Sequence, residues 1–222
     1  MSGSMSDGKA DLLGEVASYY ACRLAEHGAT ARGVDWNGEA GQLARFAQLC
    51  KVIDPSADHF SLNDLGCGYG ALLEYLSGHR ARCSYLGIDV SEEMISAARR
   101  RHADAAAARF IASCEPDRVA DYGLASGIFN VRQNRSNDEW AGYLRDVLDV
   151  LDRTSRYGFA FNCLTSYSDE DRKRSYLYYA DPCRIFDLCK RRYSREVALL
   201  HDYGLFEFTV VVRKHDRQAG AQ

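Results

Sequence analysis

A short strand in this sequence passes through three closely spaced glycines into a helix, and this turn restricts the fold. Residues 60–65 have the pattern of a strand, Gly66, Gly68 and Gly70 follow, and residues 71–76 have helical spacing. Glycine has no Cβ and tolerates positive φ, so such a turn allows the backbone to approach a ligand closely. This arrangement indicates an α/β protein with a ligand beyond the carboxyl ends of its strands.

The rest of the chain keeps alternating between strands and helices. Helices are predicted to begin at Ser91 and at Ser136, and Pro182 fits the first turn of a short helix that ends at Lys190. This order predicts an α/β fold with a doubly wound, mostly parallel, seven-stranded Rossmann-like sheet that closes with an antiparallel C-terminal hairpin. The predicted strands are residues 60–65, 85–90, 108–112, 122–129, 156–162, 197–201 and 206–212.

The N-terminal part has a different pattern. Residues 10–27 and 38–53 have helical spacing, and a polar, glycine-containing loop with Trp36 joins them. We expect residues 5–55 to form a helical N-terminal cap and residues 56–215 to form one compact catalytic unit. Residues 1–4 are expected to derive from an expression vector, and residues 216–222 are expected to be disordered.

Composition excludes several classes of protein. Hydrophobic residues make up 46% and charged residues 27% of the 222 residues, as in an ordinary globular protein, and the net charge of −3 gives no bulk argument for nucleic acid. No apolar run is long enough to span a bilayer. The eight cysteines are scattered without a Cys-x-x-Cys pair, which predicts reduced thiols, a cytoplasmic location and no metal site.

Two acidic residues indicate the kind of ligand. Asp89 ends the strand after the glycine turn, where a carboxylate accepts hydrogen bonds from ribose hydroxyls. Asp64 precedes the first glycine, where a carboxylate would repel a pyrophosphate but attract an α-ammonium group. This favours S-adenosylmethionine over NAD(P), although Gly66-x-Gly68-x-x-Ala71 also fits the dinucleotide fingerprint and keeps an oxidoreductase as an alternative.

The segments NDLGCGYGALLEYL and YLGIDVSEEMISAAR resemble the first motif and the second strand of the class I S-adenosylmethionine-dependent methyltransferases. The resemblance covers about residues 60–213. It implies that Asp64 lies near the methionine end, that the glycine turn lines the cofactor and that Asp89 binds the ribose. Many members have an acidic residue after the third strand, where this chain has Ser113 and Cys114. With two aromatic residues of the cap, the predicted cofactor-binding residues are Tyr20, Trp36, Asp64, Gly66, Cys67, Gly68, Asp89, Val90, Met94, Ser113 and Cys114.

The acceptor is expected beyond the ends of the fourth and fifth strands. Asn130 and Asn162 stand at these ends, Tyr176 follows a polar loop, and His201 lies at the closing hairpin. We predict that they form the catalytic side of the site, with Asn130, Asn162 and Tyr176 orienting the acceptor. Structural capping or packing remains the alternative for each of them. Arg132 is either a clamp for an anionic substrate or a loop residue.

These observations predict methyl transfer from S-adenosylmethionine to an oxygen or nitrogen of a small-molecule substrate. The fourth strand does not end in Asn/Asp-Pro-Pro-Tyr/Phe, which disfavours DNA adenine methylation. We expect no nucleic-acid or membrane partner, and a monomer or homodimer. The alternatives are S-adenosylmethionine chemistry without methyl transfer, namely cyclisation or aminoalkyl transfer, an NAD(P)-dependent oxidoreductase, and a non-catalytic cofactor-binding subunit.

Overall fold

A computed structural model describes residues 4–34, 38–78 and 82–214. The strands form one seven-stranded sheet in the order β3-β2-β1-β4-β5-β7-β6. The first five strands are parallel, and β7 is antiparallel to both β5 and β6, as predicted. The strands are β1 (His59–Leu65), β2 (Arg82–Asp89), β3 (Ala108–Ala112), β4 (Ala120–Ala125), β5 (Ser155–Leu164), β6 (Glu196–Leu200) and β7 (Glu207–Arg213).

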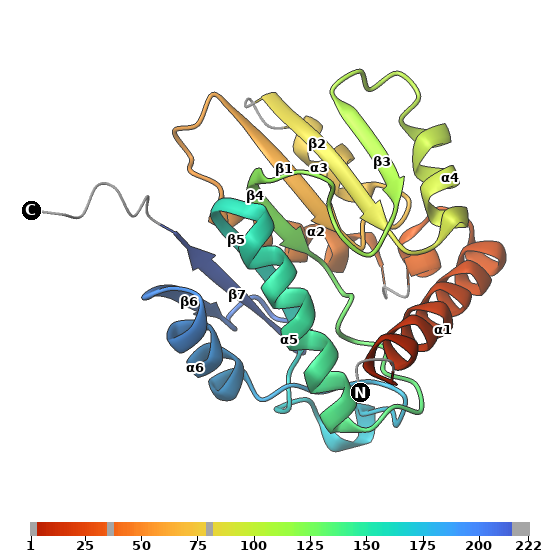
Figure 1. The fold of residues 1–222 in the computed structure, drawn as a ribbon, viewed down its shortest axis with the longest axis vertical. Coiled ribbons are helices and arrows are strands. Elements are labelled where there is room, and N and C mark those ends of the chain that lie inside the picture. The colour runs from red at the N-terminus through yellow and green to blue at the C-terminus, as the bar shows by residue number, and fades with distance from the viewer. Residues whose placement is uncertain (1–3, 35–37, 79–81, 215–222) are drawn as a thin grey trace, which may run out of the picture.

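Helices cover both faces of this sheet (Figure 1). One core joins α5 and α6 to residues such as Phe159 and Phe161, and the other joins α2, α3 and α4 to residues such as Leu62 and Ala160. Successive residues of a strand face opposite sides, so these two cores lie on opposite faces. The helices are α1 (Ser4–His27), α2 (Glu39–Leu49), α3 (Ala71–Ser77), α4 (Glu92–Arg101), α5 (Asn137–Thr154) and α6 (Pro182–Arg192), with 3₁₀ turns at Ala31–Val34, Cys50–Val52 and Glu170–Arg172.

The predicted capping signals form. In α5, the Ser136 hydroxyl accepts from the Glu139 N–H while the Glu139 carboxylate accepts from the Ser136 N–H. Ser91 caps α4 in the same position, and Asp181 caps α6 immediately before Pro182. The Trp140 indole N–H also donates to the Phe129 carbonyl at 2.7 Å, which fixes α5 against the segment after β4. These local signals therefore place the helices that frame the ends of the strands.

The α1 helix occupies a special position. It lies beyond the carboxyl ends of β1, β2 and β3 (Figure 1), and none of the described residues in the two cores belongs to it. By contrast, α2 packs Phe46 and Leu49 into the core of the sheet. The placement of α1 fits a cap, and the division into residues 5–55 and 56–215 remains a prediction. None of the described helices is long and apolar enough to cross a membrane.

Several predicted strand boundaries were wrong. The β4 strand ends at Ala125 instead of residue 129, because Gly127 adopts φ +77° and turns the chain out of the sheet. The β5 strand continues to Leu164, so Asn162 lies within the strand and pairs with Thr209. The last two strands end earlier and begin later than predicted, which places His201 in a longer connection between β6 and β7.

Candidate functional site

The glycine turn after β1 has the backbone conformation that only glycine adopts without strain. Gly66, Gly68 and Gly70 have φ values of +78°, +54° and +85°. The Gly66 N–H donates to the Ile88 carbonyl of β2 at 2.7 Å, which fixes the start of the turn. A Cβ at Gly66 would lie 2.0 Å from Ile128 Cγ2, so the turn also packs too closely for a side chain.

Asp89, at the end of β2, is fixed by backbone donors. Its Oδ2 accepts from the Gly68 N–H and its Oδ1 from the Ser91 N–H, both at 2.9 Å. Burial raises the pKa of the Asp89 carboxyl, although these donors act in the opposite direction. Each carboxylate oxygen has a second lone pair, so Asp89 can still accept from a diol such as a ribose.

Asp64 is a buried carboxylate at the end of β1. Only 2% of the residue is exposed, and the Tyr85 hydroxyl donates to its Oδ2 at 2.5 Å. Burial raises the pKa of Asp64 to about 7, against the smaller effect of the Tyr85 hydrogen bond. A cation bound in the cavity would favour the ionised form of this residue.

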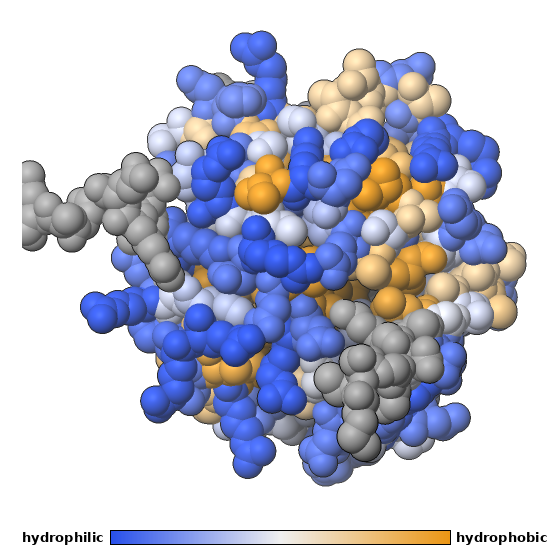
Figure 2. Space-filling view, in the orientation of Figure 1, coloured by the Kyte–Doolittle hydropathy of each residue, from blue (hydrophilic) through white to orange (hydrophobic). Residues whose placement is uncertain are grey.

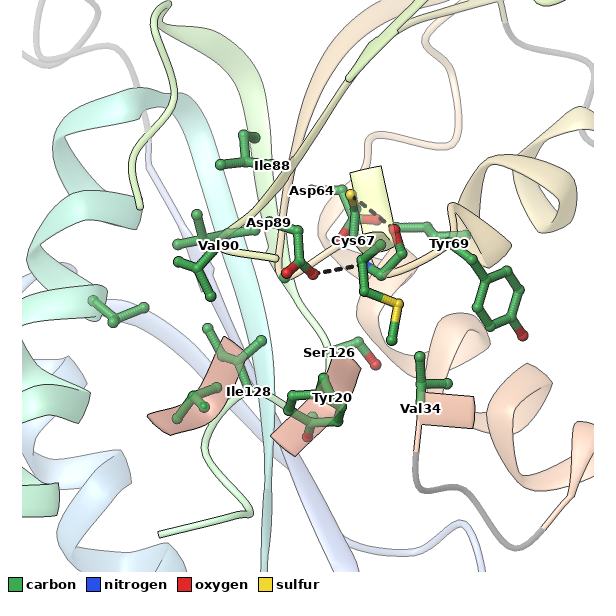
Figure 3. Close-up of a pocket in the computed structure, with 18 of the residues that line it drawn as sticks. Tyr20, Val34, Asp64, Cys67, Tyr69, Ile88, Asp89, Val90, Ser126 and Ile128 are labelled. Carbon is green, nitrogen blue, oxygen red and sulfur yellow. Dashed lines mark hydrogen bonds between the residues drawn. The ribbon is translucent and has the colours of Figure 1, made fainter. Parts of the chain in front are cut away.

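Both carboxylates line one cavity between the strand ends and the N-terminal helices (Figure 3). Figure 2 shows hydrophobic residues gathered in the same region, between the strand ends and α1. Ten of the eleven predicted cofactor-binding residues line the cavity, and Trp36 is outside the described residues. Contact with a cofactor remains a prediction for these ten: Tyr20, Asp64, Gly66, Cys67, Gly68, Asp89, Val90, Met94, Ser113 and Cys114.

The cavity wall also contains residues that the sequence did not indicate. Leu13 and Val16 line it together with Tyr20, and this spacing places all three on one face of α1. That stripe was visible in the sequence, but nothing indicated which partner it would face. Ser126 immediately follows β4, but the predicted strand 122–129 had placed it inside the sheet. The other missed residues are Val34, Gln42, Phe46, Leu65, Tyr69, Ala71, Leu72, Ile88, Gly127, Ile128, Tyr143, Val147 and Val150.

Asn162 does not fit the predicted role of orienting an acceptor. It is completely buried within β5, its Oδ1 accepts from the Gly127 N–H at 2.8 Å, and its Nδ2 donates to Glu207 Oε2 at 2.7 Å. The same Glu207 carboxylate accepts two hydrogen bonds of 2.7 Å from the guanidinium of Arg45 in α2. The amide therefore links a buried ion pair to the backbone beside the cavity.

Asn130 and Tyr176 also lie outside the cavity lining. Asn130 Oδ1 accepts from the Leu164 N–H at 3.3 Å, and its backbone carbonyl accepts from the Tyr178 N–H at 2.8 Å. Tyr176 is 41% exposed. These contacts connect the two loops after β4 and β5, which matches the structural alternative and does not support the predicted convergence on an acceptor.

The two remaining candidates on the acceptor side, His201 and Arg132, also lie outside the cavity lining. His201 is exposed, with its ring centroid 6.1 Å from those of Tyr167 and Phe208, and it does not line the cavity. The Arg132 guanidinium donates to the carbonyls of Ser175, Leu177 and Arg135. Arg132 therefore holds loops together, as its structural alternative proposed. Among the described residues, no cluster of His, Cys, Asp or Glu could hold a metal ion.

Sequence comparisons find a matching family profile and a relative. A family profile described as a methyltransferase domain matches residues 63–153. The protein named "Putative methyltransferase Rv1506c" of Mycobacterium tuberculosis (strain ATCC 25618 / H37Rv) is 60% identical over 159 residues. That alignment covers 72% of this chain and 96% of the relative.

Similar folds occur among solved structures of methyltransferases. The magnesium protoporphyrin IX methyltransferase ChlM of Synechocystis PCC 6803 with bound S-adenosylhomocysteine (SAH) has a TM-score of 0.64 at 13% identity, over 93% of this chain and 99% of its own. The DhpI–SAH complex has a TM-score of 0.62 at 18% identity, over 93% and 98%. The small RNA methyltransferase HEN1 has a TM-score of 0.56 at 15% identity, over 82% of this chain and 26% of its own.

The predicted fold is thereby confirmed, and the relative from M. tuberculosis carries the assignment to a family. The chain belongs to the class I S-adenosylmethionine-dependent methyltransferase superfamily.

Proposed function

We propose that this enzyme transfers the methyl group of S-adenosylmethionine to an oxygen or nitrogen of a small molecule. The observation that carries the proposal is the cavity that combines the glycine turn, Asp64 and Asp89 beneath a lid of α1 side chains. Asp89 would bind the ribose, and Asp64 would face the α-ammonium group of the methionine end. The glycine turn would leave room for the cofactor backbone between them.

Methyl transfer from a sulfonium is an in-line displacement. A lone pair of the acceptor forms the new bond to the methyl carbon, the S–CH₃ bond breaks, and its electron pair stays on sulfur to give SAH. The acceptor releases a proton to solvent when it is a hydroxyl or an amine. The protein's contribution is to align the two molecules and to exclude water. The largely apolar wall of Leu13, Val16 and Tyr20 would help to exclude water.

Two features support a small acceptor over a macromolecule. The α1 helix lies beyond the strand ends and would turn the site into an enclosed pocket instead of an open groove. In addition, an ion pair between Glu15 of α1 and Arg135, with an N–O distance of 2.6 Å, ties this helix to the loop before α5. Among the structural neighbours, the name of ChlM gives magnesium protoporphyrin IX as acceptor, whereas HEN1 is described as a small RNA methyltransferase. RNA is therefore the second acceptor class to test.

The test uses S-adenosylmethionine labelled in its methyl group. The purified protein is incubated with the labelled cofactor and either a small-metabolite extract or total RNA, and the products are identified by mass spectrometry. We expect SAH together with label in the small-molecule fraction. Label in RNA would overturn the proposed acceptor class. A cofactor product other than SAH would show that a different group is transferred, because only methyl transfer yields SAH.

A further inference from the structure

The cavity wall contains a hydroxyl group without a hydrogen-bond partner. The Ser126 Oγ is buried and has no partner among the described residues. Buried polar atoms are nearly always hydrogen-bonded, so an orphaned hydroxyl in a cavity calls for a partner that enters from outside. Ser126 lines the same cavity as Tyr20 and Val34 (Figure 3).

The position of Ser126 in the sheet separates it from the ribose end of the site. Leu65 of β1 pairs with Ala125 of β4, so Ser126 follows β4 beside Gly66. Asp89 ends β2, on the other side of β1. A cofactor whose ribose lies at Asp89 and whose chain crosses the glycine turn therefore directs its far end toward β4. The orphaned hydroxyl would then stand beside the far end of the cofactor.

A chain of buried hydrogen bonds fixes the backbone next to this hydroxyl. The Gly127 N–H donates to Asn162 Oδ1, Asn162 Nδ2 donates to Glu207, and the Glu207 carboxylate is fixed by the Arg45 guanidinium. Only 2% of Glu207 and 9% of Arg45 are exposed. A binding group gains precision when such a buried network fixes its main chain, because less freedom is lost on binding.

The charges of the wall restrict the acceptor. Asp64 and Asp89 are acidic, and none of the described residues that line the cavity is Lys, Arg or His. The proposed function engages both carboxylates with the cofactor. An anionic acceptor would find no cationic side chain among the described lining residues, whereas Val16, Val34 and Phe46 offer apolar contacts.

We propose that Ser126 binds the acceptor through its hydroxyl, and that the acceptor is a neutral, largely apolar molecule carrying a hydroxyl group. This inference rests on the proposed function, and it names the class of molecule at the same site. Ser126 Oγ accepts a hydrogen bond from the acceptor hydroxyl and thereby directs a lone pair of that oxygen at the cofactor. Ser126 is thus a residue that binds the acceptor, whereas Asp64 and Asp89 bind the cofactor.

The experiment uses 2-naphthol and 2-naphthoate as probes, because they share an apolar body and differ in charge at neutral pH. Binding of each to the wild-type protein saturated with SAH is followed by ligand-observed NMR. Ser126→Ala is compared with Ser155→Ala, since Ser155 Oγ is also buried without a partner but lies at the start of β5, away from the cavity lining. SAH affinity of every variant is measured by calorimetry.

We expect 2-naphthol to bind at least about tenfold more tightly than 2-naphthoate, which lacks a cationic partner. Ser126→Ala should weaken 2-naphthol about fivefold, as for the loss of one hydrogen bond, and leave SAH affinity unchanged. Ser155→Ala should change neither affinity.

Several results would overturn the inference. These are tighter or equal binding of 2-naphthoate, no binding of either probe, equal effects of the two serine variants, or a Ser126→Ala variant that loses SAH affinity instead of 2-naphthol affinity. Failure of SAH to bind the wild-type protein would instead overturn the proposed function. The two probes compared on the free protein would then still decide the charge preference of the cavity.

Discussion

The two carboxylates that line the cavity accept hydrogen bonds from different kinds of donor. Asp89 is held by two backbone N–H groups, whereas Asp64 is held by the hydroxyl of Tyr85. Burial raises the pKa of both, and for Asp64 to about 7. The charge of Asp64 therefore changes near neutral pH, and this charge decides how well the residue attracts an ammonium group.

The affinity for SAH should consequently depend on pH through Asp64. Below about pH 7 the residue is neutral in the free protein, and pairing with the α-ammonium group requires loss of its proton. The affinity should fall by up to about tenfold per pH unit as the pH decreases below this value. Calorimetry between pH 5.5 and 7.5, in buffers of different ionisation enthalpy, should detect release of a proton on binding.

Asp64→Asn is the matched control for this experiment. The variant should bind SAH more weakly at pH 7.5 and lose most of the pH dependence, because the amide does not titrate. A pH slope that is identical in the two proteins would assign the proton to another group, with Asp89 the next candidate.

Gly66→Ala should show how tightly the turn is packed. Its Cβ would lie 2.0 Å from Ile128 Cγ2, and its φ of +78° is unfavourable for alanine. We expect the free energy of unfolding to fall by about 2–4 kcal/mol from the steric overlap and the backbone strain together. Urea denaturation of the single variants and of Gly66→Ala/Ile128→Ala measures the two contributions. The double variant should recover part of the loss, and strict additivity would contradict the close contact.

At the scale of elements, α1 covers the cavity without belonging to the cores of the sheet. Leu13, Val16 and Tyr20 line the cavity, and the Glu15–Arg135 ion pair that ties α1 to the loop before α5 is partly exposed, at 46% and 22%. Such a pair contributes little to stability. The helix should therefore matter more for binding than for folding.

Deletion of residues 1–28 tests this expectation. The shortened chain should unfold cooperatively in urea, because the cores of both sheet faces remain. Its SAH affinity should fall about tenfold or more, since the apolar wall formed by α1 is lost. An unchanged affinity would remove α1 from the site, and loss of cooperative unfolding would make α1 part of the core.

The strands and helices could be predicted because their local patterns agree with the final structure. The capping box at Ser136 and Glu139 and the glycine turn are local signals that tertiary contacts did not override. The position of Asn162 within β5 could not be predicted in this way. Whether it stands at a strand end depends on how far β7 pairs with β5, and that pairing brings together residues distant in the sequence. The same limit applies to the acceptor side, which is built from loops.

At the scale of the whole molecule, the buried Arg45–Glu207 pair joins α2 to the last strand and, through Asn162, to the backbone beside the cavity. The partners are 162 residues apart, so no pattern in the sequence connects them. Removing one partner of a buried pair leaves the other charge uncompensated, which is costly.

Glu207→Gln should therefore lower the free energy of unfolding by about 3–5 kcal/mol, measured by urea denaturation. Asp117→Asn is the matched control, because it breaks the Arg109–Asp117 pair, whose side chains are 53% and 48% exposed. That variant should change the free energy by less than about 1 kcal/mol. Similar losses in both variants would contradict a special role for the buried pair.

The identity of the cofactor is tested most directly by calorimetry. The wild-type protein and Asp89→Ala are titrated with SAH and, separately, with NADH. We expect the wild-type protein to bind SAH and not NADH. Asp89→Ala should bind SAH about 1–3 kcal/mol more weakly, because hydrogen bonds to a charged acceptor are lost. Binding of NADH without a response to SAH would contradict S-adenosylmethionine as the cofactor. An SAH affinity that Asp89→Ala leaves unchanged would contradict the proposed binding of the ribose by Asp89.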